Sequence, residues 1–350
     1  MKRRTLTYSG THRSRARLTP KLLLLFSCMC TAATATPLFE EEATLEISLT
    51  GPLGSTVEDK QERAERRFVL SANGFDHDVN VRIRGNSRVR VCQFPPLRIN
   101  FERSKTEQTT FAGQDKLKLV THCRENRSAE SHVLREYVAY KIFNQIADIG
   151  YRVRLARISY SDTDTEVAPA SFDRYAFFIE SPRELIARTG ARQIEIDGVT
   201  LHSLSQDHAA RVFVFEYLIG NTDWSLVTAD NDEHCCHNGD LFKLDSEHYY
   251  VPYDFDLAGL VNTRYAKPDP SLRISRVTQR LYRGYCISSD ALRGAMQDIK
   301  ARKDSILAVV HELSELSAKD RDTTAKYIER FFEQAEDEDK LLRGFERRCL

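Results

Sequence analysis

The sequence lacks the signatures of several common classes of protein. It contains no C-x-x-C pair for a zinc site and no G-x-S-x-G turn of a serine hydrolase. Apart from a short run near its start, it has no apolar stretch that could cross a bilayer. Fifteen glycines and ten prolines among 350 residues exclude a collagen-like or wholly disordered chain. The sequence therefore predicts a globular protein with one large domain or two coupled lobes.

The chain also lacks a net charge, since 51 Lys and Arg balance 51 Asp and Glu. This balance conceals a basic start. Residues 1–35 contain seven Lys or Arg and no acidic residue, which leaves 44 basic against 51 acidic residues in the rest. A mildly acidic body argues against a dedicated nucleic-acid binder, because phosphate attraction needs a basic surface. We therefore expect no nucleic-acid partner.

The start of the chain has the pattern of an export signal. The basic residues precede the apolar run Leu22–Leu25, and small residues end at a possible cleavage site, Ala33-x-Ala35. We predict a signal peptide over 1–35 and a product that is secreted or lies in the periplasm or cell envelope. A lipid anchor at Cys28, twin-arginine export and a misassigned start are the alternatives.

Six cysteines remain after residue 35, an even number that suits an oxidising compartment. Fifteen pairings are possible in principle. Cys92 and Cys123 are the preferred pair, because they flank adjacent strand-like segments. The adjacent Cys235-Cys236 pair could tie its loop to Cys286. Zinc is the rival interpretation of these cysteines.

The coarse pattern changes from strands to helices near the middle of the chain. Period-two alternation predicts strands over 43–49, 79–84, 97–101, 117–120, 153–160 and 175–180. Helical periodicity predicts helices over 128–147, 209–219, 289–316 and 317–334. We therefore expect a two-lobed α+β protein, with a sheet-rich N-lobe over 36–180 and a helix-rich C-lobe over 181–350.

The helix predicted over 128–147 carries apolar residues on two sides. Leu134, Val138 and Ile142 form one stripe, and Tyr140 and Phe143 lie on another side. A helix of this kind is packed on both sides, so Glu136 is expected to be buried. A buried carboxylate needs a partner.

Residues 220–260 carry the strongest chemical signal. A helix ends in Asn221-Thr222-Asp223, a loop contains His237-Asn238, and a strand precedes Tyr253-Asp254-Phe255-Asp256. Carboxylate and amide oxygens of this kind suit phosphoryl transfer with Mg²⁺ or Mn²⁺. The alternative is that these residues are only turns and solvated strand ends.

Five motifs in order resemble the CotH-like family of secreted atypical kinases over roughly residues 79–260. These are the R-x-R-G-N-S stretch at 82–87, the R-E-Y helix at 135–137, Asn221-Thr222-Asp223, His237-Asn238 and the P-Y-D-F-D stretch at 252–256. The resemblance implies a protein-kinase-like fold with a sheet-rich N-lobe and a helix-rich C-lobe. It also implies transfer of the γ-phosphate of ATP to Ser or Thr of secreted proteins.

The resemblance assigns roles to individual residues. It makes Asp223 the catalytic carboxylate and Asp254 the main metal ligand, with Asn238 and Asp256 as further ligands. Glu136 resembles the helix glutamate that fixes a phosphate-binding cation.

The lysine that usually follows R-G-N-S in the family and would be this cation is absent here. In a second departure from the family, Tyr253 replaces the usual Trp. Lys118 is the preferred substitute for the lysine, with Arg98 and Lys116 as alternatives. Arg84, beside Gly85, could also contact phosphate. The alternating arginines 82, 84, 88 and 90 could instead form a solvated strand face.

The sequence thus predicts an exported ATP-dependent phosphotransferase. The cofactors would be ATP with Mg²⁺ or Mn²⁺, and the partner a secreted or cell-envelope protein. A glycan acceptor and an inactive binding protein are the alternatives.

Overall fold

The computed structural model describes residues 5–7, 10, 36–164, 171–227 and 234–350. The described residues from 36 onward belong to one compact unit. Apart from residues 5–7 and 10, the predicted signal over 1–35 lies outside the described residues. Within the ranges described, no helix is both long and apolar enough to span a membrane.

The first part of the compact unit is a closed barrel of seven strands, joined in the order β1-β2-β3-β4-β5-β7-β6. The strands are β1 (Leu45–Gly51), β2 (Arg66–Ala72), β3 (Phe75–Ile83), β4 (Leu97–Phe101), β5 (Lys116–Val120), β6 (Val153–Asp162) and β7 (Ser171–Ile179). Their alternating apolar side chains point inward and fill the barrel, as Val79, Val81 and Ile83 of β3 do. Every pair of neighbours is antiparallel except β1 and β6, which are parallel.

The predicted two-lobed, protein-kinase-like fold with a sheet-rich N-lobe is therefore wrong. β1 pairs with β6 along its whole length, from Leu45 opposite Ala156 to Gly51 opposite Asp162, and this pairing closes the sheet into a barrel. The alternation of side chains identifies a half-buried strand but not its partner, so it could not predict this long-range closure.

The second part of the compact unit is mainly helical. The helices of the described residues are α1 (Leu53–Glu58), α2 (Ser87–Val91), α3 (Arg127–Ile146), α4 (Pro182–Thr189), α5 (Gln206–Ile219), α6 (Ser289–Ala301), α7 (Lys303–His311), α8 (Ala318–Ala335) and α9 (Glu338–Glu346). Helices α1 to α3 lie between barrel strands in the sequence, and α4 to α9 belong to the second part. A small antiparallel sheet in the order β10-β9-β8 lies among them, formed by β8 (Arg192–Ile194), β9 (Gly239–Leu244) and β10 (Glu247–Pro252). The single helix predicted over 289–316 is instead broken between Ala301 and Lys303.

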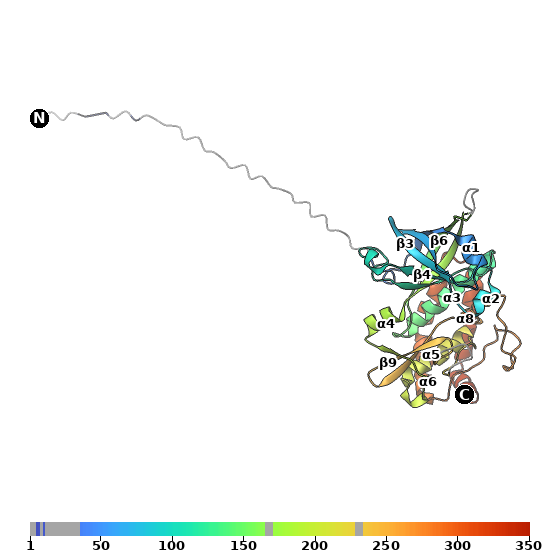
Figure 1. Ribbon diagram of the computed structural model, residues 1–350. Coiled ribbons are helices and arrows are strands. Elements are labelled where there is room, and N and C mark those ends of the chain that lie inside the picture. Colours follow the sequence, from blue (N-terminus) through green and yellow to red (C-terminus); the bar gives the residue numbers. More distant parts are fainter. Residues whose placement is uncertain (1–4, 8–9, 11–35, 165–170, 228–233) are drawn as a thin grey trace. The chain divides into compact units, whose positions relative to one another are not determined.

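Helix α3 joins the two parts. In Figure 1 it lies between the barrel strands β4 and β6 and the helix α5. Leu134, Val138 and Ile142 are buried in the helical core, as are Phe177 and Ile179 from the outer face of β7. Glu136 is 3% exposed, which agrees with the burial predicted from the two apolar stripes. The helix thus packs against both parts, and its polar residues Ser131 and Glu136 are buried between them.

The six described cysteines form three disulfides: Cys92–Cys123, Cys235–Cys236 and Cys286–Cys349. The first is the predicted pair and links the end of α2 to the segment after β5. The expected link from Cys235-Cys236 to Cys286 is wrong, because those two cysteines bond to each other. Disulfides are compatible with an extracellular protein.

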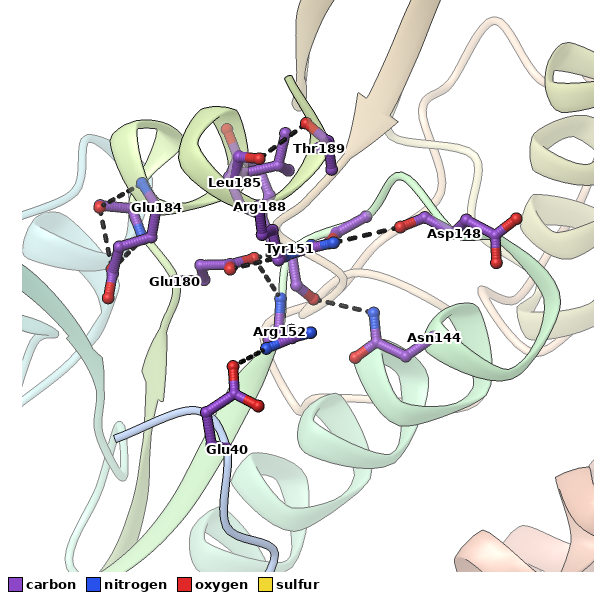
Figure 2. Close-up of polar contacts among 12 residues, drawn as sticks. Glu40, Asn144, Asp148, Tyr151, Arg152, Glu180, Glu184, Leu185, Arg188 and Thr189 are labelled. Atoms are coloured by element: carbon purple, nitrogen blue, oxygen red, sulfur yellow. Dashed lines mark hydrogen bonds and ion pairs between the residues drawn. The ribbon is translucent and has the colours of Figure 1, made fainter. Parts of the chain in front are cut away.

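A buried ion pair fixes the passage from β7 into α4. Figure 2 shows the carboxylate of Glu180 between Arg188 of α4 and the backbone of Arg152. Arg188 donates two hydrogen bonds to Glu180, of 2.8 and 2.9 Å, and the Arg152 N–H donates a third of 3.0 Å. Asn144 donates to the carbonyl of Tyr151 at 3.0 Å, which ties the same segment to α3. Because these contacts hold α4 in place, the loop before α4 forms a fixed side of the site described next.

Candidate functional site

A single buried arginine joins three of the predicted site residues. Nη2 of Arg88 lies 2.8 Å from Glu136 and 2.5 Å from Asp254, and its Nε lies 2.9 Å from Asp256. The Arg88 side chain is 8% exposed, so these ion pairs are largely shielded from water. We call Arg88, Glu136, Asp254 and Asp256 the arginine centre. It connects α2, α3 and the segment after β10.

The segment after β10 is held in position by its own contacts. Asp254 has a φ of +62°, a left-handed conformation that few non-glycine residues adopt. Its N–H donates to the hydroxyl of Tyr140 at 2.9 Å, and the hydroxyl of Tyr265 donates to Asp256 at 2.8 Å. Strained backbone of this kind often occurs at functional sites.

The charges of the arginine centre do not balance, since three carboxyl groups surround one guanidinium. Burial raises the pKa of Glu136 and raises the pKa of Asp256 to about 8, even though Arg88 opposes both shifts. Burial also acts on Asp254, but Arg88 and Arg84 outweigh it and lower the pKa of that carboxyl. Asp254 is thus the member of the three whose ionised form is most favoured, and its side chain is 39% exposed.

Asp223 belongs to a second group of polar residues at the end of α5. The helix ends at Gly220, whose φ of +66° turns the chain out of the helix. Asp223 then accepts a hydrogen bond of 2.8 Å from the side chain of Asn238, and His237 Nε2 lies 3.3 Å from its other carboxylate oxygen. The backbone N–H of Asp223 donates to the side chain of Asn221 at 3.0 Å. Both oxygens of the carboxylate are therefore oriented.

The two groups meet through the backbone. The N–H of Tyr253 donates to the carbonyl of Asn238 at 2.9 Å. Asn238 contacts Asp223, whereas Tyr253 directly precedes Asp254. The loop that orients Asp223 is thus attached to the segment that carries Asp254.

A row of cations crosses the outer face of the barrel on strands β3, β4 and β5. Arg82 lies opposite Arg98, and Arg98 lies opposite Lys118. Side chains directly opposite one another share a face, and like charges in that arrangement repel. Burial and then the charges of Arg82 and Arg84 lower the pKa of Arg98. The row is therefore a place where an anion would relieve repulsion.

Arg84 and Lys118 connect this row to the arginine centre. Burial lowers the pKa of Lys118 to about 8, and the charges of Arg84 and Arg98 add to the effect. Burial and Arg88 likewise lower the pKa of Arg84, whereas Asp254 opposes the shift. Nζ of Lys118 lies 5.1 Å from the ring centre of Tyr253.

A cavity of about 560 Å³ opens beside Lys118, between the barrel and α4. Its lining includes five cations, namely Arg98, Arg103, Lys116, Lys118 and Arg183. Asp115 and Asp240 also line it, but Asp115 pairs with Arg103 and Asp240 accepts a hydrogen bond from Tyr151. The excess of positive charge suits an anionic ligand.

The sequence reasoning missed Arg88. The cation that contacts Glu136 is this arginine and not Lys118, which lies against Tyr253 instead. The alternation in 87–91 indicated a strand face for Arg88 and Arg90, but these residues form the helix α2. A helix of five residues is too short to show helical periodicity. Its position in the sequence could have indicated Arg88 as the partner of Glu136, since Arg88 is the first cation after R-G-N-S.

The predicted metal ligands do not form a cage of their own. Among the residues that the structure describes, no group of three or more His, Cys, Asp or Glu side chains is arranged to hold a metal ion. Asp256 is occupied by Arg88 and Tyr265, and Asn238 donates to Asp223. Asp254 retains an exposed side. This donor set suits Mg²⁺ that arrives on a phosphate ligand, because Mg²⁺ often takes only one or two carboxylates from the protein.

Comparison of the chain with known proteins gives no matching family model and no matching curated protein.

Proposed function

We propose that this chain is an exported, CotH-like phosphotransferase that moves the γ-phosphate of ATP to a hydroxyl group of a secreted or cell-envelope protein. The observation that carries the proposal is the proximity of two kinds of charge. The cations Arg84 and Lys118 act electrostatically on Asp254, the exposed acid of the arginine centre. Phosphate groups need the cations, and a metal ion bound to the phosphates needs the acid.

In this proposal, different residues of the chain bind the phosphates and the metal ion. Arg84, Arg98 and Lys118 would bind the phosphates, with the nucleotide in the cavity beside α4. Arg88 holds Asp254 in place through a hydrogen bond of 2.5 Å. Asp254 would ligate Mg²⁺ or Mn²⁺, which supplies charge neutralisation on the phosphates when bound.

Asp223 would orient the acceptor hydroxyl and receive its proton. Its carboxylate is 36% exposed, so a substrate can reach it, and Asn238 and His237 fix its direction. A general base must lie within hydrogen-bond reach of the proton it takes, and a fixed carboxylate satisfies that need at low entropic cost.

The test combines binding with transfer. ATP with Mg²⁺ or Mn²⁺ should raise the unfolding temperature of the wild-type protein, because a ligand of the native state stabilises it. Asp254→Asn should abolish the metal-dependent part of the shift, and Asp223→Asn should retain the shift but transfer no label from γ-labelled ATP to Ser/Thr peptides. Asp298→Asn is the matched control, since Asp298 is 46% exposed and pairs with Arg211.

A non-catalytic binding protein is the second candidate, and one observation favours it. Arg88 already pairs with Asp254 and Asp256, which leaves less negative charge for a metal ion. A thermal shift with ATP that needs no metal, without transfer to peptides or glycans, would support this candidate. The absence of any shift with ATP, with or without metal, would contradict the phosphotransferase and favour the non-catalytic binding protein.

A further inference from the structure

Glu216 is a buried acid that the proposed reaction does not use. It lies in the last turn of α5 and is 1% exposed. Neither of its carboxyl oxygens makes a well-formed hydrogen bond, and the same is true of the buried Nδ2 of Asn221. Buried polar groups are seldom left in this state, so the pair calls for an explanation.

The neighbourhood of Glu216 leads directly to Asp223. The N–H of Asn221 donates to the backbone carbonyl of Glu216 at 2.8 Å, and the two side chains also interact. The other end of the Asn221 amide, its Oδ1, accepts the hydrogen bond from the N–H of Asp223. Asn221 is itself 1% exposed. One amide thus lies between the buried acid and the residue proposed as the catalytic carboxylate.

The charge state of Glu216 follows from its surroundings. Burial raises its pKa well above the ordinary value, the interaction with Asn221 opposes the rise, and the charge of Asp223 adds to it. Tyr250 of β10 is the other titratable neighbour, and burial raises the pKa of its hydroxyl as well. Within the described part of the chain, no cation contributes to the shift in the pKa of Glu216, in contrast to Glu136, which faces Arg88.

We propose that Glu216 is a neutral carboxylic acid that positions Asn221 and, through Asn221, holds the turn that directs Asp223 toward the acceptor. Glu216 is a positioning residue, and this inference deepens the proposed function. A carboxylic acid can both accept a hydrogen bond from the amide and donate one, whereas an ionised carboxylate would add a second negative charge behind Asp223.

The protonation state has a test that needs no activity. The infrared spectrum should contain carbonyl absorption of protonated carboxylic acids at neutral pH, and Glu216→Gln should remove the part that Glu216 contributes. The folded protein retains a proton that the unfolded chain loses above its ordinary glutamate pKa, so stability should fall as pH rises from there. The unfolding equilibrium constant of the wild type should therefore rise about tenfold per pH unit relative to Glu216→Gln.

The positioning role is tested with variants of similar length. Glu216→Gln should retain phosphate transfer within about twofold, whereas Glu216→Leu should lower kcat about tenfold or more with KM for ATP unchanged. Glu216→Met replaces Glu216→Leu if the latter does not fold. The ring resonances of His237, which contacts Asp223, should move in the apolar variant and stay in Glu216→Gln.

Each outcome decides one of the two proposals. If the wild type transfers no phosphate, the proposed function is contradicted. The His237 resonances still test the role of Glu216 in that case. Unmoved resonances in Glu216→Leu, full transfer by that variant, or carboxylic-acid absorption that Glu216→Gln leaves unchanged would overturn the inference.

Discussion

Nη2 of Arg88 lies 2.8 Å from Oε1 of Glu136, and both side chains are more than nine-tenths buried. This ion pair joins a helix of five residues, α2, to the long helix α3. A buried pair is costly to break, because the remaining partner is left charged and without water.

We expect Arg88→Ala to destabilise the protein by about 3–5 kcal/mol, since it leaves Glu136 and Asp256 without their cation. Urea unfolding at neutral pH measures the change. Arg103→Ala is the control, because the pair of Arg103 with Asp115 is about half exposed and should contribute only about 0–1 kcal/mol. Equal effects of the two substitutions would contradict the importance given to the arginine centre.

ATP affinity should fall as pH rises through about 8, where Lys118 loses its proton. Lys118→Arg should remove this dependence, because arginine stays charged over the whole range. Binding measured by calorimetry between pH 7 and 9 gives the comparison. Lys116→Arg, two residues away on β5, should leave the dependence as it is. A wild-type affinity that is flat across this range would show that Lys118 does not contact the phosphates.

Three histidines, of which His122 and His208 are buried, should make the protein sensitive to acid. Burial lowers the pKa of His122 to about 3 and the pKa values of His132 and His208 to about 4. Because these folded-state values lie below the ordinary 6.5, the stabilisation is complete above pH 6.5 and is lost as pH falls toward 4. Each histidine contributes up to about 1.4 kcal/mol per pH unit in that window.

His122→Phe should reduce the loss of stability that occurs as pH falls. Both ring nitrogens of His122 lack a partner, and the ring stacks on Phe94 at 4.6 Å, so a phenyl ring suits the site. Denaturant midpoints at pH 7, 6 and 5 measure the slope. An unchanged slope would mean that His122 does not contribute to it.

Removal of Cys92–Cys123 should impair function more than removal of Cys286–Cys349. Each double Cys→Ser variant should lose about 2–4 kcal/mol of stability, because each disulfide restrains the unfolded chain. Cys92, however, is the residue at the end of α2, four positions after Arg88. ATP-induced thermal shifts should therefore shrink in the first variant and persist in the second. The reverse order would contradict the coupling of α2 to the site.

Much of the fold could be predicted from the sequence, because local patterns determine it. The strand over 97–101 coincides with β4, and the helix over 128–147 corresponds to α3 within a residue. Periodicity also indicated the burial of Glu136. The closure of the barrel could not be predicted, because the pairing of β1 with β6 depends on residues far apart in the chain.

The candidate site shows the same contrast between local patterns, which could be predicted, and long-range contacts, which could not. Asp223 with Asn238, and Asp254 with Asp256, were singled out by their positions beside ordered elements and by the family resemblance. Arg88 was missed, because its role depends on which carboxylates the fold brings to it and no local spacing encodes that. Glu216 was missed because its surroundings, and not its neighbours in the sequence, make it unusual.

The parallel seam between β1 and β6 also constrains the order of assembly. A chain that leaves the ribosome, or a translocation pore, N-terminus first exposes β1 well before β6, since β2 to β5 and all of α3 lie between them. During that interval one edge of β1 has no partner, and unpaired edges are sites of association with other chains. Until β6 is made, that edge of β1 is therefore open to association with other chains, a hazard that the finished barrel no longer shows.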